Sequence, residues 1–177
     1  MRKALCAEMP ELGYSVSATT RSPRPGETPG VDYFFMSREE FARGIEEDGF
    51  LEWAEVYGNW YGTPRQYVEE MINSGRDVVL EIDIQGARQI KQRYPEGIFV
   101  FVVPPTMEEL ARRLTGRGTD PPEEIARRLS QAAEEMECAH EYDYVIVNDE
   151  VEKAVATLKS IIEAERCRIR ESGDSQA

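Results

Sequence analysis

Several features that mark common protein classes are scarce or missing in this chain. No apolar run approaches the ~20 residues that a membrane-spanning helix needs, and residues 1–10 lack the apolar stretch of a signal peptide. The three cysteines, Cys6, Cys138 and Cys167, are far apart, which excludes a disulfide framework and fits a reducing compartment, so we expect a cytoplasmic protein. The single histidine, His140, argues against a catalytic triad and a multi-histidine site, so we expect no protein-bound metal.

Positive charge is scarce as well. The chain has 34 acidic and 21 basic residues, for a net charge of -13. Nucleic acids and anionic membranes both need a broad basic surface, so we expect neither as a partner. The basic residues comprise 17 arginines and only 4 lysines, and arginine is the better residue for bidentate contacts with phosphate. Codon bias would explain this excess equally well, so the positions of the arginines matter more than their number.

The 177 residues, 41% hydrophobic and 31% charged, predict one globular domain. Three apolar segments, 78–84, 98–103 and 143–149, alternate with helical segments. This order is typical of a parallel sheet covered by helices on both faces, so the predicted fold class is α/β. We also expect a strand over 14–20, strand pieces within 33–65, and helices over 2–9, 38–48, 64–74, 84–94, 106–137 and 150–170. The capping box Ser37-x-x-Glu40 predicts the start of the second helix.

A proline-rich loop follows the strand expected over 14–20. Ser17, Arg21 and Arg24 lie on this strand and loop. Two arginines three residues apart can bind a phosphate from two sides, and the prolines reduce the entropy cost of holding them there. The alternative is a solvated loop in which the arginines pair with Glu27 or Asp32.

A second group of polar residues lies among aromatic ones. It contains Tyr33, Glu52, Tyr61 and Thr63. Tyrosine and threonine hydroxyls can hydrogen-bond a phosphate or a base edge, and a carboxylate such as that of Glu52 can accept from the N–H donors of guanine. The alternative is a small aromatic core, and for the two tryptophans we favour it.

A third group combines five arginines with a Gly-x-Gly break between helical segments: Arg112, Arg113, Arg117, Arg127 and Arg128. Three arginines on one side of a helix–loop–helix suit a mobile lid over a polyphosphate. The alternative is a solvated helix face with glutamate–arginine pairs, each worth only ~0.3–0.5 kcal/mol.

Asp83 lies near the end of the apolar segment 78–84. Acidic residues at such positions organise magnesium in phosphoryl-transfer enzymes. Aspartate is also a good helix N-cap, so both interpretations stay open.

Taken together, these segments resemble the guanylate kinase family over nearly the whole chain. The matching segments occur in family order: SVSATTRSPRPGE, GVDYFF, FLEWAEVYGNWYGTP, VVLEIDIQGA, PPTMEEL, RLTGRGTD and YVIVND. The resemblance implies a parallel-sheet nucleoside-monophosphate-kinase fold with a GMP-binding subdomain at about 33–65 and a lid at about 106–130. It places a single guanylate-kinase-like domain over 1–170 and a flexible tail over 171–177.

The resemblance also implies roles for individual residues. Nine of them would bind GMP: Ser17, Arg21, Arg24, Tyr33, Glu52, Tyr61, Thr63, Glu81 and Asp83. The arginines and tyrosines of this set would take the phosphate, and Ser17, Glu52 and Thr63 the guanine. Arg113, Arg117 and Arg128 would be the catalytic lid arginines that reach the transferring phosphoryl group. Arg113 and Arg117 would also bind ATP, and Asn148 would lie near its adenine. The implied substrates are GMP and ATP with Mg²⁺, as MgATP, in purine nucleotide metabolism.

One part of the family pattern is missing. The family opens with a strand and the phosphate loop G-x-x-x-x-G-K-[ST], whose main-chain amides and lysine hold ATP. No glycine in residues 1–177 is followed by lysine. We therefore expect the first central strand and the phosphate loop to be missing, and Met1 to be either a misplaced start or an artificial boundary of the sequence. We also expect a gap in the sheet, poor or altered folding, and weak ATP binding and catalysis.

Phosphoryl transfer from MgATP to GMP, giving GDP and ADP, is the leading functional interpretation. The alternatives are a non-catalytic guanylate-kinase-like binding module, as in cell-junction scaffolds, and a GMP-binding remnant without turnover. The complete GMP set favours the enzyme, and the missing phosphate loop favours the other two.

Overall fold

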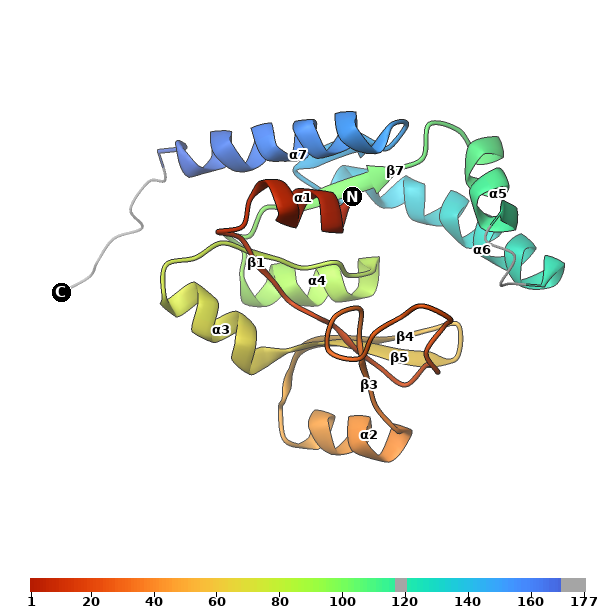
Figure 1. Cartoon of the computed structure of the whole chain (residues 1–177), viewed down its shortest axis with the longest axis horizontal. Coiled ribbons are helices and arrows are strands. Elements are labelled where there is room, and N and C mark those ends of the chain that lie inside the picture. The colour runs from red at the N-terminus through yellow and green to blue at the C-terminus, as the bar shows by residue number, and fades with distance from the viewer. Residues whose placement is uncertain (117–120, 170–177) are drawn as a thin grey trace. The chain divides into compact units, whose positions relative to one another are not determined.

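The computed structural model describes residues 1–116 and 121–169, shown in Figure 1. Contacts divide the chain into two compact units, one formed by Cys6–Phe99 and the other by Met1–Leu5 together with the chain from Val100 onward. The single domain predicted over 1–170 stays a prediction. The tail predicted over 171–177 lies outside the described residues.

The unit Cys6–Phe99 is built around a four-stranded mixed sheet. Its strand order is β3-β2-β5-β4. The strands are β2 (Ala18–Thr19), β3 (Phe34–Phe35), β4 (Phe50–Val56) and β5 (Asn59–Pro64). β2 runs parallel to β3 and antiparallel to β5, and β4 and β5 form an antiparallel hairpin. Tyr57 and Gly58 turn this hairpin with φ angles of 51° and 75°, as a tight primed turn requires.

Helix α2 (Arg38–Glu46) packs against this sheet. Ser37 and Glu40 form the predicted capping box, in which the Ser37 hydroxyl accepts from the Glu40 N–H and the Glu40 carboxylate accepts from the Ser37 N–H. The Phe41 side chain is fully buried in a core with Ala18 and Phe50. Its ring stacks on that of Phe50 with a centroid distance of 4.4 Å. The apolar face of α2 is thus what holds the helix on the sheet.

Three more helices and a second small sheet complete the first half of the chain. Their bounds are α1 (Arg2–Glu8), β1 (Gly13–Tyr14), α3 (Arg65–Asn73), β6 (Val78–Val79) and α4 (Ile84–Arg93). β1 and β6 pair in parallel. α4 lies along the free edge of β4, where the Gln89 side chain donates to the Trp53 carbonyl at 2.8 Å and accepts from its N–H at 3.3 Å. Figure 1 shows α2 and α4 on the two sides of the β4–β5 hairpin.

The other unit pairs two parallel strands with helices. Its elements are β7 (Val100–Val103), α5 (Met107–Gly116), α6 (Pro122–Met136), the short helix η1 (Glu137–Glu141), β8 (Tyr144–Val147) and α7 (Val151–Arg166). β7 and β8 are in register from Val100 opposite Tyr144 to Val103 opposite Val147. Inside this unit, the buried Glu165 of α7 accepts a hydrogen bond from the Tyr144 hydroxyl of β8. α5 and α6 lie in the segment expected to be helical over 106–137, and residues 117–120 between them are outside the described residues. Parallel strands with helices confirm the α/β class.

One expectation about strands is wrong in detail. The segment 14–20 is not one strand, because Tyr14 pairs with Val79 while Thr19 pairs with Phe35 and Tyr61. The main chain leaves one sheet and enters another between these two positions. Among the described residues, the three apolar segments lie in two ladders, because β6 pairs with β1 and β7 pairs with β8. The gap expected in the sheet stays a prediction.

The cysteines and the single histidine lie in different elements of the chain. Cys6 and Cys138 are partly buried, Cys167 is exposed, and none of the three forms a disulfide with another described residue. His140 lies in η1, where its Nδ1 is 2.7 Å from the Glu137 carbonyl oxygen. Within residues 1–116 and 121–169, no helix combines the length and apolar character needed to cross a membrane.

Candidate functional site

A buried carboxylate, that of Glu52 on β4, is the most unusual group in the unit Cys6–Phe99. Only 4% of Glu52 and 1% of its partner Thr63 are exposed. The two residues face each other in the β4–β5 ladder, and the Thr63 hydroxyl donates to Glu52 Oε1 at 2.6 Å. Burial raises the pKa of Glu52 to about 7, and the nearby Asp83 carboxylate adds to the rise while Thr63 opposes it. Such a carboxylate, short of hydrogen-bond donors, is suited to accept from a ligand's N–H groups.

An irregularity in β4 places this carboxylate. A regular strand would direct Phe50 and Glu52 to the same face of the sheet. The register shifts between these two residues, as a β-bulge does. Phe50 therefore packs on Phe41 of α2, whereas the carboxylate of Glu52 lies against Gly86 of α4.

Asp83 lies at the start of α4, close to Glu52. It is the N-cap residue, and its Oδ1 accepts from the Gly86 N–H at 2.8 Å. The N-cap alternative for Asp83 is therefore confirmed. The Gln85 side-chain amide donates a hydrogen bond to Asp83 Oδ2 at 3.3 Å. This hydrogen bond is exposed, so a ligand could replace it.

Arg21 and Arg24 are organised by one carboxylate, that of Glu27. The Arg21 guanidinium donates to both oxygens of Glu27 at 2.8 and 3.1 Å, and the Arg24 main-chain N–H donates at 2.7 Å. The hydrogen bonds from Arg21 contribute most to lowering the pKa of Glu27. The ion pair between Arg21 and Glu27, which the sequence offered as the alternative to phosphate binding, is thus present in the structure.

Two tyrosines surround the Arg21 guanidinium. Its Cζ lies 5.3 Å from the ring centroid of Tyr33, within cation–π range, and the rings of Tyr33 and Tyr61 meet edge-on at 6.1 Å. Burial raises the pKa of Tyr33, helped by Tyr61 and then by Glu81. Glu81 itself lies 3.5 Å from the hydroxyl of Tyr14. One arginine, two phenols and a carboxylate from four separate segments are therefore neighbours.

Ser17 is the remaining member of the predicted GMP set, and it is buried beside β2. Its carbonyl accepts from the Phe34 N–H of β3 at 2.9 Å. All nine predicted GMP residues belong to the unit Cys6–Phe99. The structure connects them in two groups, Glu52–Thr63–Asp83 and Arg21–Tyr33–Tyr61–Glu81, with Ser17 and Arg24 on the segment that carries Arg21.

The residues predicted to face ATP belong to the other unit. The Arg113 guanidinium donates to Glu109 at 2.7 Å and to the main-chain oxygens of Asn148 and Asp149 at 2.7 and 3.0 Å. The side-chain oxygen of Asn148 is buried and has no hydrogen-bond partner within the part of the chain that the structure describes. Arg128 pairs with Glu124 at 3.2 Å. Arg117 lies outside the described residues.

The glutamate–arginine pairs offered as the alternative to a lid are present on both helices. Glu109 pairs with Arg112 and Arg113 on α5, and Glu124 pairs with Arg127 and Arg128 on α6. Arg112 and Arg127 are exposed in these pairs, whereas the two glutamates, Arg113 and Arg128 are partly buried.

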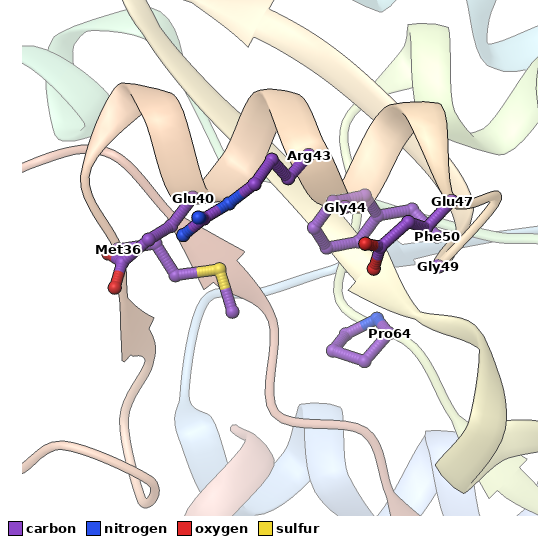
Figure 2. A pocket seen from close by; sticks show the side chains of 8 residues that line it. All are labelled: Met36, Glu40, Arg43, Gly44, Glu47, Gly49, Phe50 and Pro64. Atoms are coloured by element: carbon purple, nitrogen blue, oxygen red, sulfur yellow. The ribbon is translucent and has the colours of Figure 1, made fainter.

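A shallow pocket of about 490 Å³ lies elsewhere on the unit Cys6–Phe99. Figure 2 shows its lining, from α2 and the adjoining ends of β4 and β5: Met36, Glu40, Arg43, Gly44, Glu47, Gly49, Phe50 and Pro64. None of the predicted GMP residues lines it, and most of its charged residues are exposed. The chemistry of the unit is concentrated at Glu52 and Arg21 instead. Among the described residues, no cluster of three or more His, Cys, Asp or Glu side chains is placed to hold a metal ion.

Comparison with known proteins decides the family. The guanylate kinase family model matches residues 1–165. The chain belongs to the guanylate kinase family. It is a nucleoside monophosphate kinase, a nucleotide-binding transferase. The guanylate kinase of Desulfitobacterium hafniense is 58% identical over 166 residues, covering 94% of this chain and 83% of the relative. That of Caldanaerobacter subterraneus is 52% identical over 172 residues, covering 97% and 84%.

A solved guanylate kinase structure shows the same fold. The crystal structure of the Anaplasma phagocytophilum enzyme superposes with a TM-score of 0.80 at 38% identity, covering 93% of this chain and 82% of that one. The guanylate-kinase-like α/β fold predicted from the sequence is therefore confirmed.

Several contributors to the guanylate kinase site were missed by reasoning from the sequence. Gly86 and Gln89 of α4 shape the surroundings of Glu52 and Trp53, and Glu27 was considered only as a competitor for the arginines. No local pattern reveals Gly86 or Gln89, because their partners lie more than thirty residues away. The carboxylate of Glu27 could have been found from its spacing, since a residue six positions after Arg21 in a Pro/Gly loop can fold back onto it.

Proposed function

We propose that the chain transfers the terminal phosphoryl group of MgATP to GMP, giving ADP and GDP. The observation that carries this proposal is the arrangement of one compact unit, in which a buried acceptor carboxylate and an arginine–tyrosine cluster come from the same four-stranded sheet. A guanine base has N–H donors, and a nucleotide phosphate needs cationic and hydroxyl donors. The two groups supply these complementary partners.

The guanine end of the proposed substrate would be read by Glu52. Its Oε1 accepts from the Thr63 hydroxyl, and its Oε2 lies toward Gly86 of α4. Ser17 and Thr63 are both buried and offer hydroxyl groups nearby in the same unit. Asp83 would accept further N–H donors from the base. Binding guanine N–H groups favours the ionised form of Glu52, which offsets the effect of burial on its pKa.

The phosphate end would be bound by Arg21, Arg24, Tyr33 and Tyr61. Arg21 is already held near both tyrosine rings. A phosphate dianion carries more negative charge than the Glu27 carboxylate, so it would share or replace Glu27 as partner of the guanidinium. The negative charge of Glu81 helps to raise the pKa of Tyr33 and so keeps its hydroxyl group protonated as a donor.

On the ATP side, we propose that Arg113, Arg117 and Arg128 offset charge on the transferring phosphoryl group and that Asn148 contacts the adenine. The unpartnered side-chain oxygen of Asn148 supports this role, because the adenine amino group is a donor. Catalysis by positioning and charge neutralisation requires no covalent intermediate. The magnesium ion would arrive with ATP as part of the substrate.

We further propose that turnover by residues 1–177 is limited at the ATP phosphates. No glycine in this sequence is followed by lysine, so no G-x-x-x-x-G-K-[ST] segment is present to supply the amide and lysine cradle. GMP binding depends on the unit Cys6–Phe99 and should persist.

The test measures GMP binding by calorimetry and ADP production by a coupled assay on the same preparation. We expect micromolar-to-millimolar GMP binding by residues 1–177, and an increase in turnover when a strand and phosphate loop from a relative are joined before Met1. Arg21→Ala should weaken GMP binding about tenfold or more, since it removes a charge-assisted contact. The matched control Arg43→Ala removes an exposed arginine of the same unit and should leave GMP binding unchanged. Absence of GMP binding by the wild-type chain would contradict the proposal.

A further inference from the structure

The absence of a side chain at Gly86, the third residue of α4, leaves the room in which the Glu52 carboxylate lies. A Cβ atom built on Gly86 would overlap Glu52 Oε2 and lie 2.9 Å from Glu52 Cδ. Protein Cβ atoms essentially never come this close to another heavy atom. Any larger residue at position 86 must therefore move either the carboxylate or the helix.

The carboxylate is not free to move. Its other oxygen accepts the 2.6 Å hydrogen bond from the Thr63 hydroxyl, and both residues are almost fully buried. Their main chains are paired in the β4–β5 ladder. Rotating Glu52 away from α4 would break the bond to Thr63 and leave a buried polar group unsatisfied.

The helix is not free to move either. Gln89, one turn after Gly86, holds the main chain of Trp53 with two hydrogen bonds. Asp83 caps the first turn through the Gly86 N–H. The next residue, Ala87, is itself buried. A methyl group on residue 86 would therefore clash with the Glu52 carboxylate, and neither this carboxylate nor α4 can move to relieve the clash.

We propose that Gly86 is a positioning residue, which sets the place of the Glu52 carboxylate and through it the affinity for guanine. The part concerning guanine rests on the proposed function. Gly86 touches neither substrate nor reacting atoms in this proposal, and it acts only through Glu52. An alanine at this position keeps the main-chain N–H that donates to Asp83. Alanine also has a higher helix propensity than glycine. Loss of binding in such a variant would therefore not come from a weaker helix.

The first measurement is the GMP dissociation constant of the full chain in a double-mutant cycle. Gly86→Ala should raise this constant about tenfold or more, because Glu52 is displaced from its hydrogen-bonding position. In the Glu52→Ala background the same change should have little effect, since no carboxylate remains to be displaced. An equal fold increase of the GMP dissociation constant in the wild-type and Glu52→Ala backgrounds would overturn the proposal.

The second measurement needs no nucleotide. Carbon-13 NMR of the Glu52 carboxyl group follows its titration in the free chain. Gly86→Ala should move the apparent pKa toward the ordinary value of a glutamate, because the displaced carboxylate is better hydrated. An unchanged titration would overturn the proposal. If the wild-type chain does not bind GMP, the proposed function fails, and the titration alone decides whether Gly86 positions Glu52.

Two further variants keep the outcome decisive. Gly116→Ala adds the same methyl group to a helical glycine of α5, where no described atom lies within 4 Å of the added carbon, so GMP binding and the Glu52 titration should not change. If Gly86→Ala alone fails to fold, the double variant Glu52→Ala/Gly86→Ala should regain its folded circular dichroism spectrum. Failure to regain it would show that the methyl group clashes with something other than Glu52, which contradicts the proposal.

Discussion

The carboxylate of Glu27 accepts hydrogen bonds from the side chain of Arg21 and the main chain of Arg24 at once. It thereby holds Arg21 beside Tyr33 before any ligand is present. We predict that Glu27→Ala weakens GMP binding about three- to tenfold, because the loop must then be ordered on binding. Binding of guanosine, which lacks the phosphate, should change little. Calorimetric titration of both ligands tests this, with the exposed Glu46→Ala of α2 as the control. Equal losses for the two ligands would show that Glu27 supports the whole unit.

Glu52 makes the stability of the chain depend on pH. Its pKa is about 7 in the folded chain against 4.5 as the ordinary value, so the folded state holds the proton more tightly than the unfolded state. Its stabilising contribution is therefore full below pH 4.5 and is lost as pH rises through 7, by roughly 3 kcal/mol in total. We predict that Glu52→Gln, which cannot ionise, flattens this part of the stability profile. Urea unfolding between pH 4.5 and 8.5 measures the free energy of unfolding of both proteins. If it changes with pH in the variant as it does in the wild type, Glu52 is not the group responsible.

At the scale of elements, α2 depends on its N-terminal capping box. Ser37 and Glu40 each accept from the other's main-chain N–H, and Phe41 of the same helix supplies the buried contact with the sheet. We predict that Ser37→Ala lowers the free energy of unfolding by about 1 kcal/mol. The double variant Ser37→Ala/Glu40→Ala should lose less free energy of unfolding than the sum of the two single variants, because the two hydrogen bonds form one motif. Glu39→Ala, in the same turn but outside the box, is the control. Full additivity would show that the two bonds act independently.

At the scale of the whole molecule, the nine residues predicted to bind GMP lie in Cys6–Phe99, and those predicted to face ATP lie in the unit that contains β7 and β8. A ligand stabilises the part of the chain that it binds, by about 2.7 kcal/mol at a concentration of 100 Kd. We predict that saturating GMP slows amide hydrogen exchange mainly within residues 6–99. Amides of β7, β8 and α7 should change less. Exchange followed by mass spectrometry tests this, and equal protection of both units would contradict it.

Short-range features were predictable because their partners are near in sequence. The capping box of α2 spans four residues, and Gly75, with φ of 77°, follows α3 as expected. The segment 14–20 was predicted wrongly as one strand because its two halves have the same β-favouring composition. Only the identity of their distant partners, Val79 for one half and Phe35 with Tyr61 for the other, separates them.

The amino-acid sequence by itself determined the order of helices and strands, the acidic charge, the absence of a cysteine framework, and the set of arginines, tyrosines and carboxylates that marks the family. These properties depend on composition and on spacings of a few residues. The tertiary structure alone decided which faces of β4 meet α2 and α4, because a bulge changes the register after Phe50. It also decided the proton affinity of Glu52, which depends on burial, on Thr63 and on Asp83, and the need for glycine at position 86. Desolvation and steric contact arise only when distant segments pack together, so no local pattern could reveal them.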